Sequence, residues 1–119
     1  MKPVDMRGSD DCLISCLASV LELSPEDLPT LGPEHNDGSW YDVVQGTVRA
    51  MGWELVYTEN APVPFRPWGH HIAGGPSPRG CKGGHAVVCL DGYVIHDPHP
   101  SRAGIPSIEH WYLLFPGGN

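Results

Sequence analysis

The sequence is poor in basic residues, with 7 lysines and arginines against 14 aspartates and glutamates and a formal net charge of −7. Phosphates repel such a chain, so nucleic acid and an anionic membrane surface are not expected as its main partners. No apolar run approaches the roughly 20 residues of a membrane-spanning helix. The opening MKPVDMRGSDD also lacks an apolar secretory core, and we therefore expect a cytoplasmic protein.

The four cysteines show no paired CxxC spacing, which is the usual signature of a zinc site. In a cytoplasmic compartment we expect the thiols to stay reduced. The seven histidines could supply metal ligands, but the usual ligand spacings are missing, and we predict neither a metal nor another cofactor. Instead, we expect most of the histidines to be surface or loop residues, among them His70, His71, His99 and His110.

The length of 119 residues suits a single domain spanning 1–119. Apolar periodicity predicts a buried helix over 11–23 and a second helix over 39–51. The remaining apolar segments read as strands, and the clearest pair is the hairpin HAVVCL and YVIHD around an Asp-Gly turn. Helices followed by four or five antiparallel strands predict an α+β fold, with strands over 53–59, 70–75, 85–90, 93–97 and 108–115.

Three residues in this pattern favour thiol chemistry. Cys12 stands at the start of the buried helix, where the helix N-terminus lowers the pKa of a thiol. His85 opens the first hairpin strand and Asp97 closes the second. A nucleophile, a base and a group that orients the base are the parts that thiol catalysis needs, so we predict a Cys12–His85–Asp97 triad.

The register of the hairpin decides which residue orients His85. A two-residue Asp91–Gly92 turn directs Asp97 to the opposite face of the sheet and leaves His96 on the face of His85. A three-residue loop, with Gly92 in a left-handed bulge conformation, places Asp97 directly across from His85. We favour the three-residue loop and Asp97, because a carboxylate also stabilises the imidazolium.

The segments DDCLISCLASVLEL and HAVVCLDGYVIHDP resemble two motifs of papain-like cysteine peptidases, and most closely those of the double-glycine peptidases that trim bacteriocin leaders. The resemblance implies a papain-like core, with Cys12 as nucleophile, His85 as base and Asp97 as the third member. In this clan a glutamine six residues before the cysteine usually donates to the oxyanion. Met6 occupies that position here, and the sole glutamine of the chain is Gln45.

The remaining cysteines differ in their expected burial, and two loop residues are candidates for substrate binding. We expect Cys16 and Cys89 to be core residues and Cys81 to be exposed in its Gly-rich loop. Trp68, in a proline-rich loop, is the candidate to line a substrate groove. Arg102 is the candidate to bind a carboxylate or an acidic side chain of a substrate, and the turn residues of its segment slightly favour the simpler role of redirecting the chain after the hairpin.

Together these features predict a thiol hydrolase that cleaves a peptide, isopeptide or side-chain amide in a peptide or protein substrate. Two alternatives stay open. A Cys-dependent acyltransferase or transglutaminase-like enzyme would use the same residues with an amine as acceptor. A non-catalytic papain-like module that binds a peptide or protein is favoured by Met6, because the usual oxyanion donor is missing.

Overall fold

The computed structural model describes residues 1–6, 12–28, 39–59, 69–78 and 84–116. These described residues contain two α-helices, α1 (Cys12–Leu21) and α2 (Ser39–Ala50), with the short 3₁₀ helix η1 (Pro25–Asp27) between them. Five strands follow and form one sheet: β1 (Trp53–Glu59), β2 (His70–Gly75), β3 (His85–Leu90), β4 (Tyr93–His96) and β5 (His110–Pro116). All neighbouring strands are antiparallel, in the order β1-β5-β2-β3-β4. The predicted α+β fold is confirmed at this level.

Both helices end where the backbone turns left-handed. Helix α1 stops two residues before the predicted end because Glu22 adopts a φ of 56°. The N–H of Leu23 then donates to the Ala18 carbonyl at 2.9 Å, as in a Schellman cap. Helix α2 is followed by Gly52 at a φ of 87°, in agreement with the prediction that this glycine ends the helix.

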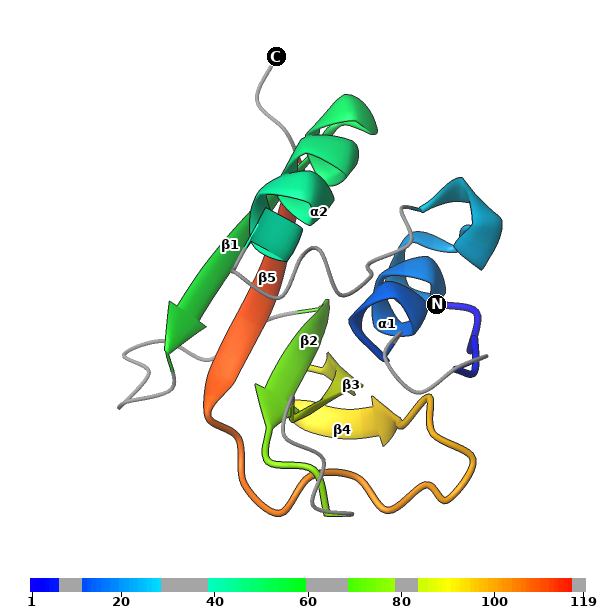
Figure 1. Ribbon diagram of the computed structural model, residues 1–119, viewed down its shortest axis with the longest axis vertical. Coiled ribbons are helices and arrows are strands. Elements are labelled where there is room, and N and C mark those ends of the chain that lie inside the picture. Colours follow the sequence, from blue (N-terminus) through cyan, green and yellow to red (C-terminus); the bar gives the residue numbers. More distant parts are fainter. Residues whose placement is uncertain (7–11, 29–38, 60–68, 79–83, 117–119) are drawn as a thin grey trace.

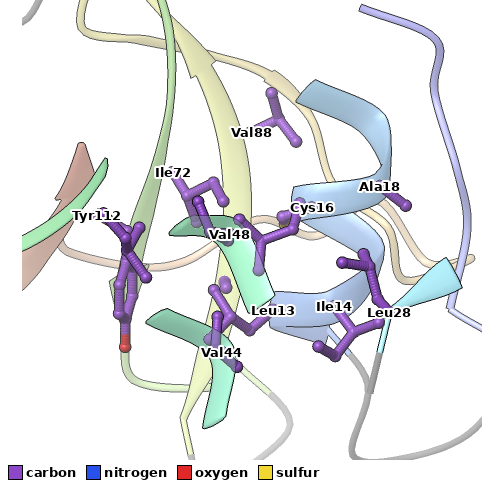
Figure 2. Close-up of a cluster of buried hydrophobic side chains, with 13 residues drawn as sticks. Leu13, Ile14, Cys16, Ala18, Leu28, Val44, Val48, Ile72, Val88 and Tyr112 are labelled. Atoms are coloured by element: carbon purple, nitrogen blue, oxygen red, sulfur yellow. The ribbon is translucent and has the colours of Figure 1, made fainter. Parts of the chain in front are cut away.

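The sheet separates two apolar clusters. The larger cluster fills the face covered by the helices, where α1 packs on β3 and β2 and α2 packs on β1 (Figure 1). Figure 2 shows the side chains of this cluster, including Cys16 of α1, Val48 of α2 and Tyr112 of β5. The smaller cluster lies on the opposite face and packs under the segment between β4 and β5, with the members Ala73, Val87, Cys89, Trp111 and Leu113. The predicted burial of the first helix is confirmed.

The hairpin of β3 and β4 corrects the predicted register. Leu90 pairs with Tyr93, so the turn has two residues and not three. Asp91 and Gly92 have φ values of 51° and 89°, the two positive values of a type I′ turn. One step further the register shifts, because Cys89 pairs with Val94 whereas Val88 pairs with His96. Ile95 is therefore the extra residue of a β-bulge.

Candidate active site

His85 and Asp97 form a buried pair at the end of the hairpin. The Nε2 atom of His85 lies 2.6 Å from Oδ1 of Asp97, and the two side chains are only 2% and 4% exposed. Because the carboxylate oxygen can only accept, Nε2 carries the proton and Nδ1 is the proton acceptor of the neutral ring. Asp97, and not His96, is therefore the residue that is hydrogen-bonded to His85, as the orienting role expected for it requires.

The bulge, and not the loop length, brings these residues together. Continuing the observed register by one residue places Asp97 opposite Val87, on the same face as His85 and diagonal to it. If Ile95 paired with Val88 and left no bulge, Asp97 would stand opposite Ala86 and point to the other face. The predicted pairing is thus right, but the predicted register was wrong, and the bulge supplies the one-residue shift.

Backbone donors from the following segment complete the environment of Asp97. The N–H of His99 donates to Oδ1 at 2.9 Å, and the N–H of Gly104 donates to Oδ2 at 2.6 Å. Burial alone would raise the pKa of Asp97, but the hydrogen bonds from His85, His99 and Gly104 outweigh it and lower the pKa below its ordinary value. Asp97 is therefore an ionised carboxylate at neutral pH, able to stabilise an imidazolium.

His96 does not contact His85 and instead binds the N-terminal segment. It points to the face opposite His85, because it pairs with Val88, and its Nε2 donates to the Val4 carbonyl at 3.0 Å. The same ring nitrogen lies 3.6 Å from the carboxylate of Asp5. His96 thus fastens the N-terminal segment to the end of β4.

Cys12 is the first residue of α1, half-buried and packed against the larger apolar cluster. Side-chain alternation along β3 places His85 on the face of Val87 and Cys89, which is the face away from the helices. On that face the His85 ring is hydrogen-bonded to Asp97. A working triad therefore requires the imidazole to reach Cys12 around the end of β3, where His85 is the first residue.

Burial lowers the reactivity of the other thiols in the described parts of the chain, because it raises their pKa values. Burial, together with the charges of Cys12, Asp97 and Cys89, raises the pKa of Cys16 well above its ordinary value. Burial raises the pKa of Cys89 to about 12. The influence of Asp97 on Cys16, one turn below Cys12, shows that the carboxylate lies within electrostatic range of α1. Cys81 lies outside the described residues.

No glutamine takes the usual oxyanion position. The backbone N–H of Met6 donates to the Pro98 carbonyl at 2.9 Å, and the side chain of methionine has no donor. Gln45 donates from Nε2 to the Leu55 carbonyl at 3.2 Å and so connects α2 to β1. Neither residue is a candidate for the second oxyanion donor.

Of the two predicted substrate-binding residues, Trp68 and Arg102, the structure describes only Arg102. Trp68 lies outside the described residues. The guanidinium of Arg102 is bound within the protein, by the carboxylate of Asp5 and by the backbone carbonyl of Asp97. Its segment turns the chain after the hairpin, which is the simpler of the two roles considered for it. Asp5 was missed because its partner is 97 residues away in the sequence and no local pattern marks the pair.

His71 corrects the expectation of a surface or loop histidine. It is 1% exposed on β2, where its Nδ1 donates to the Gly69 carbonyl at 2.9 Å and its ring contacts Trp111. Burial lowers its pKa, which keeps the ring neutral. His99 lies near His85, with ring centroids 6.2 Å apart in an edge-to-face arrangement. Within the described residues, no group of three or more His, Cys, Asp or Glu side chains is arranged to hold a metal ion.

Comparison of the chain with protein families, with curated proteins and with solved structures finds no match in any of the three. In the part of the chain that the structure describes, no helix has both the length and the apolar character needed to cross a bilayer.

Proposed function

We propose that the protein is a thiol hydrolase with a papain-like core, in which Cys12 is the nucleophile, His85 the base and Asp97 the group that orients His85. The observation that carries the proposal is the buried 2.6 Å bond between His85 and Asp97. A carboxylate held by three hydrogen bonds fixes the tautomer of the ring and stabilises the charge that the ring gains. Such a pair is typical of nucleophilic catalysis.

The reaction follows from these roles. Nδ1 of His85 takes the thiol proton as the Cys12 sulfur attacks the carbonyl carbon of the amide, and a C–S bond forms. The negative oxygen of the tetrahedral intermediate accepts a hydrogen bond from the Cys12 backbone N–H. The C–N bond then breaks, and His85 returns the proton to the leaving amine. Water, deprotonated by His85, hydrolyses the thioester and restores the thiol.

The positions of the thiols add support. Of the described cysteines, only Cys12 is not fully buried. Its place at the first residue of an α-helix favours the thiolate, because unsatisfied N–H groups give the helix N-terminus a partial positive charge. Cys16 and Cys89 have the opposite environment, with pKa values raised by burial.

Alkylation by iodoacetamide tests the proposal without a known substrate. The reagent is small and uncharged, and peptide mapping by mass spectrometry gives a rate for each cysteine. We expect Cys12 to react fastest and to keep its reactivity below about pH 7, because an ordinary thiol has a pKa of about 8.5. His85→Ala should lower that rate about tenfold or more at neutral pH. His70→Ala is the matched control and should leave the rate unchanged.

The result that overturns the proposal is a Cys12 rate equal to that of an ordinary thiol and unaffected by His85→Ala. A non-catalytic binding module would behave in this way. If Cys12 is reactive, a thioester adduct that is released by an amine faster than by water would assign the chain to the acyltransferases instead.

A further inference from the structure

We propose that Asp5 and Arg102 form a positioning pair that holds Asp97 in place for His85 and links it to the N-terminal segment leading to Cys12. This inference rests on the proposed function. Neither residue touches the reacting atoms, so both act through Asp97.

The guanidinium of Arg102 has three acceptors. Its Nη1 donates to Oδ1 of Asp5 at 2.7 Å, and its Nη2 donates to Oδ2 of the same carboxylate at 3.0 Å. Nη1 also donates to the backbone carbonyl of Asp97. The planar fork of arginine matches a carboxylate in two places, which fixes its orientation as well as its distance. The backbone of Asp97 is thus held by the same group that binds Asp5.

The N-terminal segment 1–6 lies between α1 and the end of β4 and is fastened on both sides. On one side it donates two backbone hydrogen bonds to Ser19 of α1, from Lys2 at 3.1 Å and from Val4 at 2.8 Å. On the other side it is bonded to the chain just after the bulge, through Val4 with His96 and Met6 with Pro98. Asp5 stands in the middle of this segment, so its bond to Arg102 joins the segment to Asp97.

The backbone conformation of Arg102 indicates that the surrounding contacts fix the position of this residue. Its φ of 54° is left-handed, a conformation that non-glycine residues rarely adopt. The cost of such a conformation is borne only where surrounding contacts determine it. Here the N–H of Arg102 donates to the His99 carbonyl at 3.0 Å, and the N–H of Gly104 donates to the Asp97 side chain.

If the Asp5–Arg102 pair only stabilised the fold, its contribution to the free energy of unfolding would be small. Asp5 and Arg102 side chains are 50% and 49% exposed, and exposed ion pairs add little to the free energy of unfolding. The pair Arg49–Glu54 is a natural control, since its side chains are 56% and 40% exposed and it joins α2 to β1. It makes no contact with Asp97 among the described residues. A substitution that lowers the Cys12 rate in the Asp5–Arg102 pair but not in the Arg49–Glu54 pair therefore acts through the contact with Asp97, and not through the loss of an ion pair in general.

The test compares Arg102→Gln and Asp5→Asn with Arg49→Gln in the full chain. The first two variants should each lower the rate of Cys12 alkylation by iodoacetamide about tenfold at neutral pH, and should move the alkaline rise of the rate to higher pH. Arg49→Gln should leave both unchanged. Arg102→Lys should restore only part of the rate, because one ammonium cannot reproduce the two-pronged contact. Urea unfolding of all variants measures stability separately.

The outcomes separate the two proposals. If wild-type Cys12 is reactive and depends on His85, but Arg102→Gln and Asp5→Asn match Arg49→Gln, the positioning role is wrong and the thiol hydrolase stands. A loss of rate that follows the loss of unfolding free energy in all variants, the Arg49 variant included, also overturns it. If wild-type Cys12 reacts like an ordinary thiol, both proposals are wrong.

Discussion

Replacing Asp97 by asparagine tests whether this carboxylate holds the segment between β4 and β5. Asp97 accepts three hydrogen bonds in a site where it is 5% exposed. The asparagine side chain can keep its oxygen toward His85 and the His99 N–H, but its amide group then faces the N–H of Gly104, donor against donor. The variant loses one charge-assisted hydrogen bond and leaves a buried donor unpaired, which together should cost about 3 kcal/mol of unfolding free energy.

The pH dependence of this cost has a definite sign. The pKa of Asp97 is lowered in the folded state, so its contribution is present above the unfolded-state pKa of about 3.9 and is lost as the pH falls through the folded-state value. The difference between wild type and Asp97→Asn in urea unfolding should therefore be full at neutral pH and shrink toward about pH 3. Glu54→Gln, which alters an exposed carboxylate, should change stability by less than about 1 kcal/mol. Equal stability of wild type and Asp97→Asn at neutral pH, or a difference that does not shrink in acid, would show that the ionised Asp97 does not hold this segment.

Three further outcomes follow from the structure. Deleting Ile95 removes the bulge but leaves His96 opposite Val88 and Asp97 opposite Val87, on the face of His85, so Cys12 alkylation should keep its dependence on His85; a Cys12 rate that no longer responds to His85→Ala would contradict the observed register. Gly75→Ala should destabilise the fold by about 2 kcal/mol in urea unfolding, because a Cβ there collides with the backbone carbonyl of Ser107. Gly46→Ala, whose Cβ meets open space on α2, should instead stabilise by about 1 kcal/mol, and the opposite order of these two variants would refute the packing.

The elements with strong local patterns were predictable. Helix α1 follows from its run of apolar side chains behind a helix start, although its left-handed end at Glu22 was not predicted, and the strands of the β3–β4 hairpin follow from their apolar runs and the Asp-Gly turn. The predicted three-residue loop was wrong, because the turn has two residues and a bulge follows it. A bulge depends on how Asp97 and its segment pack, and nothing in the local sequence of β4 marks Ile95 as the extra residue.

The His85–Asp97 pair was predictable from the sequence, whereas the residues that hold it in place were not. His85 and Asp97 stand out because each flanks an apolar strand. The pair of Asp5 and Arg102 connects residues 97 positions apart, and His71 is buried by Trp111 and the sheet, not by its neighbours in sequence. Such contacts arise from tertiary packing, which periodicity does not report. Cys12 was placed correctly at the start of α1, whereas its approach to His85 stays a prediction.

The distance between the Cys12 sulfur and Nδ1 of His85 decides whether Cys12, His85 and Asp97 form a triad. It should be measured in a crystal structure of the wild-type chain, alongside the chain whose Cys12 carries a carbamidomethyl group. We predict a separation of about 4 Å in the free protein, with Nε2 of His85 still bonded to Asp97. A sulfur that stays on the helix-covered face, with the His85 ring held beyond reach on the face of Val87, would contradict it.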